Sequence, residues 1–180
     1  PGGPLDLEQA PARYFVGKPY IMGHTAEFVA QKLGITREEM DAVALRSQNN
    51  VERANDDGSF KAEIVPLEVP QRRKEPLVFA RDEHFRAGLT LADLKKLPPA
   101  FVPKTGTVTA GNASGINDGA AAMMIMAAAK ADELGLKPLA RIKALGRGAC
   151  HPELMGLSPV PAVNDLLTRS GLKIADFELV

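Results

Sequence analysis

Apolar residues recur at helical spacing in the first part of the chain, and turn-forming residues separate the runs. The run Thr36-Arg37-Glu38-Glu39 has the spacing of a capping box, in which a Thr hydroxyl and a Glu carboxylate satisfy each other's orphan amides. Prolines at 66 and 70 restrict the extended segment beside them to an edge strand. The pattern predicts a helix over residues 22–34 starting near Thr25, a second from Thr36 toward Arg53, strands over 62–69 and 77–79, and a short helix from Thr90 to Leu97.

From Val108 onward, the pattern changes to alternating strands and helices. Gly135 and Gly171 each follow a segment with helical periodicity, and glycine is common just past a helix C-terminus. This alternation is typical of an α/β fold, whereas the region up to about Phe101 is predicted to be a cap or lid. The predicted order is strand 108–110, buried strand 121–126, helix 127–134, strand 140–145, helix 161–170 and strand 177–180.

Composition predicts a soluble globular protein, since 45% of the residues are hydrophobic and 24% are charged. The 22 basic and 22 acidic residues give no electrostatic case for nucleic acid or an anionic membrane as a partner. The longest apolar run, Ala120 to Ala129, is shorter than the roughly 20 residues that cross a bilayer. A single cysteine cannot form an internal disulfide, which suits a reducing compartment, and we predict a cytoplasmic protein.

The segment after Thr107 carries the strongest candidate chemistry. Gly111, Gly115 and Gly119 recur every four residues and let a ligand or a second backbone approach closely. Two interpretations remain open, a binding loop and a tight strand-to-helix turn with Asx capping. The polar side chains that bear on both are Asn112, Ser114, Asn117 and Asp118.

Residues 106–122, GTVTAGNASGINDGAAA, resemble the pantetheine-contacting segment of thiolases, the coenzyme A-dependent acyltransferases of the acetyl-CoA acetyltransferase type. The resemblance covers nearly the whole chain from about Tyr20 and follows thiolase order. Its other segments are Met22-Gly23-His24-Thr25-Ala26-Glu27, Ser47-Gln48-Asn49, Phe60-Lys61-Ala62-Glu63-Ile64-Val65-Pro66, Arg86-Ala87-Gly88, Leu97-Pro98-Pro99-Ala100-Phe101 and Met155-Gly156-Leu157-Ser158-Pro159-Val160-Pro161-Ala162.

The resemblance implies an α/β, partial thiolase fold, with a coenzyme A-binding loop domain and parts of the two α/β halves. Residues 1–134 would end the N-terminal domain, including an inserted loop domain over about 1–104, and residues 135–180 would begin the C-terminal domain. The activity implied is reversible thiolytic cleavage of 3-ketoacyl-CoA, or condensation of two acetyl-CoA, through an acyl-cysteine. No catalytic cysteine or histidine of the family matches within this chain, so we expect an internal piece of a longer homodimer or homotetramer, inactive alone.

The resemblance also assigns roles to individual residues. The Ser114 hydroxyl and the Ala110 carbonyl would contact the pantetheine amides. Arg86 would lie near the adenine and phosphates, and Leu97 would pack on the nucleotide. Met22 and Met155 would line the thioester end. Core filling for the two methionines and a solvated surface charge for Arg86 are the alternatives. Coenzyme A or acyl-CoA is expected as substrate, with no metal and no prosthetic group.

Two positions depart from the family pattern. Ile21 stands where many thiolases have a histidine, and Asp93 stands where a serine commonly contacts the nucleotide, although an aspartate would repel phosphates. Ile21, together with the family's catalytic residues that this chain lacks, leaves open a non-catalytic, thiolase-like subunit that binds acyl-CoA or a partner protein. Adjacent Cys150 and His151 are not expected to form a catalytic dyad, because neighbouring side chains of an extended segment point to opposite faces.

Overall fold

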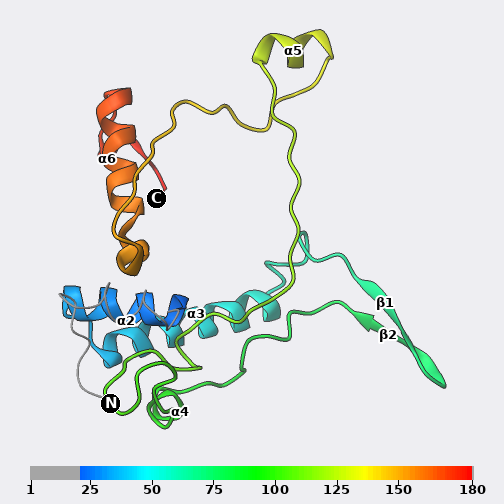
Figure 1. The fold of residues 1–180 in the computed structure, drawn as a ribbon. Coiled ribbons are helices and arrows are strands. Elements are labelled where there is room, and N and C mark those ends of the chain that lie inside the picture. The colour runs from blue at the N-terminus through cyan, green and yellow to red at the C-terminus, as the bar shows by residue number, and fades with distance from the viewer. Residues whose placement is uncertain (1–20, 180) are drawn as a thin grey trace. The chain divides into compact units, whose positions relative to one another are not determined.

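The computed structural model describes residues 21–179, which form helices, a two-stranded sheet and long connecting segments (Figure 1). The chain divides into two units, Pro1–Gly115 and Ile116–Val180. The first unit contains α2 (Met22–Leu33), α3 (Arg37–Asp56), β1 (Leu67–Gln71), β2 (Lys74–Phe79) and α4 (Leu91–Lys95). The second contains α5 (Ala128–Glu133), the 3-10 helix η1 (Pro152–Leu157), α6 (Pro159–Ser170) and the 3-10 helix η2 (Ile174–Asp176). The predicted domain boundaries stay predictions, and residues 1–20 of the proposed loop domain lie outside the described residues.

The two predicted N-terminal helices are confirmed, with one shifted start. Helix α2 begins at Met22 rather than near Thr25, because the Thr25 hydroxyl donates to the Met22 carbonyl from within the first turn. Gly34 ends the helix in the left-handed region, at φ 67°. The capping box at the start of α3 forms as predicted, since the Thr36 backbone N–H donates to Glu39 Oε2 at 2.8 Å and the Glu39 N–H donates to Thr36 Oγ1 at 3.2 Å.

We expect Thr36→Ala to raise the pKa of Glu39. The Thr36 backbone N–H and hydroxyl hold the pKa of this carboxyl below its ordinary value, and loss of the hydroxyl loosens the box. Because the folded pKa is depressed, the stabilisation exists above the unfolded pKa and disappears as the pH falls through the folded one. An NMR pH titration of the Glu39 side chain measures the change. Thr36→Ser keeps the hydroxyl and should leave the pKa low; an unchanged pKa in Thr36→Ala contradicts this account.

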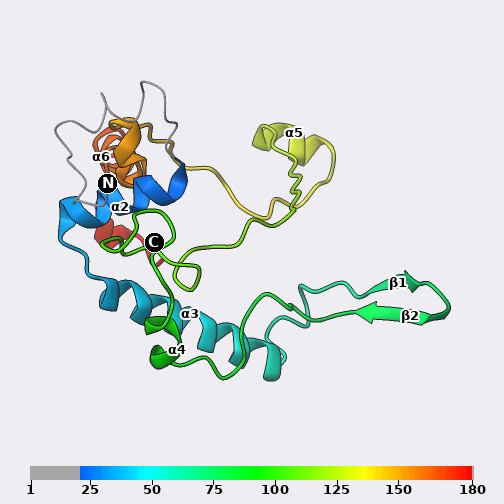
Figure 2. The ribbon, with the colours of Figure 1, turned by 60° about the horizontal axis from the view of Figure 1, so that its bottom comes forward.

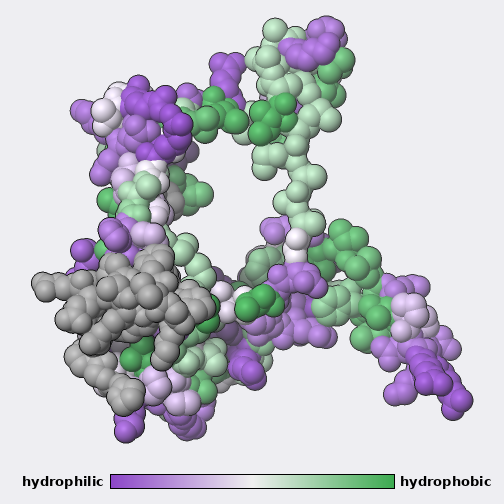
Figure 3. Space-filling model, viewed as in Figure 1, coloured by the Kyte–Doolittle hydropathy of each residue, from purple (hydrophilic) through white to green (hydrophobic). Residues whose placement is uncertain are grey.

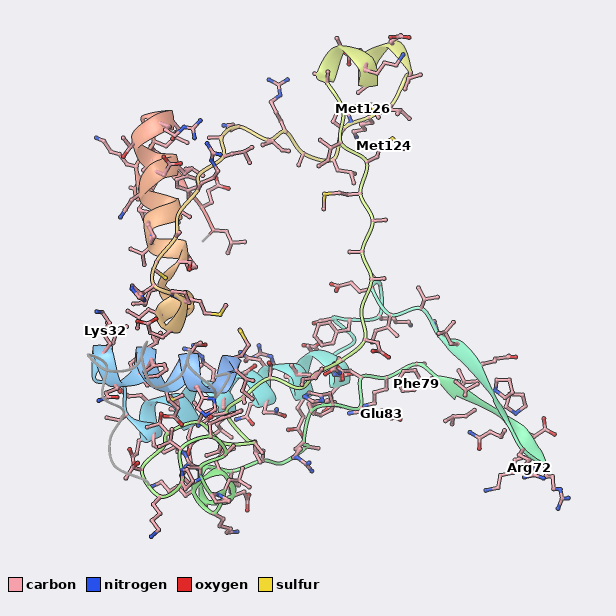
Figure 4. All side chains as sticks on the ribbon, in the orientation of Figure 1. Lys32, Arg72, Phe79, Glu83, Met124 and Met126 are labelled. Carbon is pink, nitrogen blue, oxygen red and sulfur yellow. The ribbon has the colours of Figure 1, made fainter. Side chains whose placement is uncertain are left out.

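Strands β1 and β2 form an antiparallel hairpin and lie side by side in both ribbon views (Figures 1 and 2). The register pairs Leu67 with Phe79 and Val69 with Leu77, and it shifts between Val69 and Gln71, around Pro70. The first strand begins five residues later than predicted, because Lys61 to Ile64 continue in hydrogen-bonded turns with carbonyls of 58 and 60. All residues of both strands are exposed. The basic residues at 72–74 occupy the tip, where Figure 3 is hydrophilic and Figure 4 labels Arg72.

The helices of the second unit agree with the sequence, but its strands do not. Gly135 and Gly171 adopt φ 66° and 71° just past α5 and α6, as expected for glycine C-caps. Over the described residues, which end at 179, the strands predicted at 121–126, 140–145 and 177–180 are absent, as is the strand predicted at 108–110 in the first unit. Figure 4 shows Met124 and Met126 on a single extended run of chain. A strand exists only when a neighbour pairs its backbone groups, and no described segment pairs with these.

Candidate functional site

The predicted binding segment forms a turn at residues 110–112. Asn112 Oδ1 accepts the Thr109 N–H at 2.8 Å, and Thr109 Oγ1 accepts the Gly111 N–H at 3.2 Å. Val108 and Thr109 are buried, whereas Ala110 and the following Ser114 are exposed. The Asn112 side chain therefore caps this turn, as the second interpretation of the sequence proposed, but neither a strand nor a helix flanks it.

A buried glutamate on α2 holds the start of this segment. The Glu27 carboxylate accepts the Thr107 backbone N–H at 2.9 and 3.0 Å, the Thr107 hydroxyl at 2.8 Å and the Val108 backbone N–H at 2.9 Å. Glu27 is only 4% exposed. Hydrogen bonds that an ionised group accepts are stronger than neutral ones, and they satisfy backbone donors that no strand partner reaches. Glu27 thus fixes the backbone just before the turn.

A second buried acid, Asp41 on α3, holds the other side of the turn. Asp41 Oδ1 accepts a bond from Asn112 Nδ2 at 3.0 Å, and its Oδ2 accepts one from Arg37 Nε at 2.7 Å. The Arg37 guanidinium also donates to the carbonyls of Leu94 and Leu97, at 2.7 and 3.2 Å. This network joins α3, the turn and the end of α4, which packs against α3 (Figure 2).

Leu97 lies beside the turn, and its packing on a nucleotide stays a prediction. A Cβ built on Gly111 would lie 2.6 Å from Leu97 Cδ1 and 2.5 Å from Leu94 Cδ2, so any larger residue at 111 would force these leucine methyl groups to move. Leu94 is buried and Leu97 is half-buried. Leu97 therefore contacts the turn with one side of its side chain and keeps part of its surface exposed.

Ser114, Ala110 and Arg86 keep their polar groups available. The Ser114 hydroxyl, the Ala110 carbonyl and the Arg86 guanidinium form no hydrogen bond or ion pair with any residue between 21 and 179. All three residues are exposed. Arg86 nevertheless has a fixed backbone, because its N–H donates to Gln48 Oε1 at 2.8 Å. Their exposure is compatible with the ligand contacts that the resemblance assigns, and those contacts stay predictions.

The two methionines are exposed, which argues against core filling within the described chain. Met22 opens α2 with 64% of its surface exposed, and Met155 lies in η1 with 40% exposed. Met155 belongs to the second unit and the other candidate residues belong to the first. The role of both methionines at a thioester stays a prediction.

Asp93 serves as the capping acid of α4. Its Oδ2 accepts bonds from the Thr90 backbone N–H and hydroxyl, and its Oδ1 accepts a bond from Lys96 Nζ at 2.9 Å. The Thr90 hydroxyl, followed by Lys96, holds the pKa of this carboxyl below its ordinary value. The carboxylate is thus ionised at neutral pH but faces the Lys96 cation. Ile21, the other departure, lies at the exposed N-cap of α2.

Cys150 and His151 bond to different partners. The Cys150 thiol lies 3.0 Å from the Leu154 carbonyl oxygen and 3.2 Å from Ser158 Oγ. His151 Nδ1 lies 2.8 Å from Glu153 Oε2. The thiol thus bonds to Leu154 and Ser158 rather than to His151, which agrees with the expectation that Cys150 and His151 form no dyad.

Neither a metal centre nor a membrane span emerges from the described residues. Between 21 and 179, no cluster of three or more His, Cys, Asp or Glu side chains is placed to hold a metal ion. No helix in that same range is long and apolar enough to cross a bilayer.

Comparison with known proteins agrees with the resemblance. The acetyl-CoA acetyltransferase of Chromobacterium violaceum is 53% identical over 161 residues, which are 89% of this chain and 41% of that protein. A probable acetyl-CoA acyltransferase of Staphylococcus aureus strain COL is 48% identical over 160 residues, covering 89% of this chain and 40% of that protein. The chain thus spans about two fifths of the length of these curated relatives.

Solved structures give the same answer. The crystal structure of Bacillus anthracis acetyl-CoA acetyltransferase matches with a TM-score of 0.79 and 44% identity, over 91% of this chain and 41% of that one. Human mitochondrial 3-ketoacyl-CoA thiolase in complex with CoA matches with a TM-score of 0.75 and 44% identity, over 88% and 38%. The thiolase N-terminal domain family matches residues 13–129, more than half of the chain. The chain therefore belongs to the thiolase family and has a partial α/β thiolase fold.

Proposed function

We propose that this chain is the coenzyme A-binding part of an acetyl-CoA C-acyltransferase. The observation that carries the proposal is the anchored turn at 110–112, whose buried side is held by Glu27 and Asp41 while Ala110 and Ser114 stay exposed. A long ligand with two amides and anionic phosphates needs such fixed polar groups and a cation. The relative solved with CoA, 44% identical, supports this ligand.

The reaction proposed for the whole protein is reversible thiolytic cleavage of 3-ketoacyl-CoA, or condensation of two acetyl-CoA, through an acyl-cysteine. Catalytic cysteine and histidine side chains would come from outside this chain. The residues present here bind and orient the substrate, which lowers the entropic part of the barrier. We propose a cytoplasmic homodimer or homotetramer that uses no metal or prosthetic group.

The test is Ser114→Ala in the full-length protein. Losing one hydrogen bond to a pantetheine amide should raise the KM for coenzyme A about 3- to 10-fold and change kcat little. Ser47→Ala, on the exposed side of α3, is the matched control and should behave as the unmodified protein. Equal KM values in both variants would contradict the role of Ser114.

Tight CoA binding by the unmodified full-length protein without any thiolysis would instead favour the alternative function, a non-catalytic acyl-CoA-binding subunit.

Cys150→Ser should leave thiolysis nearly unchanged. The serine hydroxyl can donate to the Leu154 carbonyl in place of the thiol, and Cys150 has no bond to His151. The measurement is kcat in the full-length protein, with the melting temperature as a check on folding. A loss of several orders of magnitude would mean that this cysteine takes part in the chemistry.

A further inference from the structure

Two side chains on one face of α3 hold the backbone that carries Arg86. Gln48 and Glu52 are four residues apart, so they lie one above the other on the helix. Gln48 Oε1 accepts the Arg86 N–H at 2.8 Å. The Glu52 carboxylate accepts the Gly88 N–H with both oxygens, at 3.1 and 3.2 Å.

A third residue on the same face extends the contact. Asp56, four residues after Glu52, bonds to the Arg81 guanidinium at 3.1 Å, and Arg81 lies 5.4 Å from the centre of the Phe85 ring. Residues 81–88 are thus docked along one side of α3, and Figure 4 labels Glu83 in this segment. Gly88 has φ 68°, a left-handed conformation that suits glycine and turns the chain two residues after Arg86.

These hydrogen bonds fix the backbone around Arg86 but do not involve its guanidinium. Its backbone N–H donates to Gln48 Oε1, whereas its guanidinium has no hydrogen-bond or ion-pair partner within residues 21–179. When an arginine binds an anion, both its side chain and the loop that carries it lose freedom, and a loop backbone that is already fixed removes the second of these costs. The guanidinium fork suits phosphate oxygens.

We propose that Gln48 and Glu52 are positioning residues, which aim Arg86 at the phosphate groups of coenzyme A. The inference rests on the proposed function, because it assumes that this chain binds coenzyme A. Neither residue needs to touch the ligand. Both act through the backbone on either side of Ala87, so they affect only the part of the ligand that Arg86 meets.

The test compares coenzyme A with pantetheine, which lacks the nucleotide and its phosphates, by calorimetric titration of the full-length protein. Gln48→Ala and Glu52→Ala should each raise the Kd for coenzyme A about 3- to 10-fold and leave the Kd for pantetheine within about twofold. Arg86→Ala should show the same discrimination. Glu52→Gln keeps an acceptor oxygen for the Gly88 N–H and should restore the affinity for coenzyme A.

The neighbouring Asn49→Ala is the matched control, because that exposed side chain has no hydrogen bond to a described residue, and it should change neither Kd. Equal losses for both ligands in Gln48→Ala and Glu52→Ala, no loss for either, or failure of Glu52→Gln to restore binding would each overturn the positioning role. Failure of the unmodified protein to bind coenzyme A would overturn the proposed function itself and this inference with it. Melting temperatures identify variants that do not fold.

Discussion

Glu27→Ala is expected to destabilise the protein by about 2–4 kcal/mol and to release the segment at 107–108. The substitution removes a buried carboxylate that accepts two backbone N–H groups and one hydroxyl. Those donors would stay in a largely buried site without an acceptor, which costs more than an ordinary hydrogen bond contributes. Because the turn at 110–112 follows directly, its affinity for a pantetheine chain should fall as well.

Urea unfolding and amide hydrogen exchange measure these effects. The Thr107 and Val108 amides should exchange much faster in Glu27→Ala, which distinguishes release of this segment from a general loss of stability. Glu38→Ala is the control, since Glu38 is an exposed glutamate with no bond to a described residue, and its effect should stay within about 0.5 kcal/mol. Unchanged exchange at Thr107 and Val108 would show that Glu27 does not hold them in solution.

Asp41→Ala is the second change with a large expected effect, about 2–4 kcal/mol of destabilisation. The Asp41 side chain is only 2% exposed and accepts bonds from Arg37 and from Asn112. Its removal leaves a half-buried guanidinium without its counter-charge and an amide without its acceptor. The Arg37 bonds to the Leu94 and Leu97 carbonyls limit the loss, because the cation keeps those partners.

An exposed ion pair provides the comparison for Asp41. Lys130 and Glu133 lie 2.6 Å apart on α5, with side chains 51% and 64% exposed, and Glu133→Ala should cost less than about 1 kcal/mol. Urea unfolding of both variants checks the difference. A similar, small effect in the two variants would mean that burial does not strengthen the Asp41 network.

The helices could be predicted because their signals are local. The capping box of Thr36 and Glu39 spans four positions, and Gly34, Gly135 and Gly171 mark helix ends by their own left-handed conformation. The two strands of the hairpin were predicted in place but not in their bounds: the first begins at Leu67 because turns continue to Ile64, and the second begins at Lys74 rather than at 77. Their antiparallel pairing, with its shift around Pro70, comes only from the structure. The predictions of strands at 121–126 and 140–145 were wrong, because a strand needs a neighbouring strand to pair with, and a local sequence pattern does not supply one.

The site residues likewise divide into those that local motifs identify and those that only long-range contacts reveal. The family resemblance identified groups that the structure leaves exposed, such as Ser114 and Arg86. It did not identify Glu27, Asp41 or Arg37 as the residues that hold the turn. Their partners lie 57 to 81 positions away, so spacing alone does not connect them. The available signal was that Glu27 directly precedes Phe28, one of the apolar residues at helical spacing; the structure shows both buried, and a buried acid requires several donors.

The sequence by itself determined the positions of the α-helices, the capping box of α3, the glycine helix ends and the thiolase family, because hydrophobic period, capping chemistry and ordered motifs all lie in contiguous residues. Only the tertiary structure decided how the turn at 110–112 is held and which polar groups remain free. Helix α2 contacts the segment after Gly106, which lies 80 positions further along the chain. There the Glu27 carboxylate accepts hydrogen bonds from backbone N–H groups. Whether a side chain supports the fold or faces a ligand depends on which distant groups have already satisfied it.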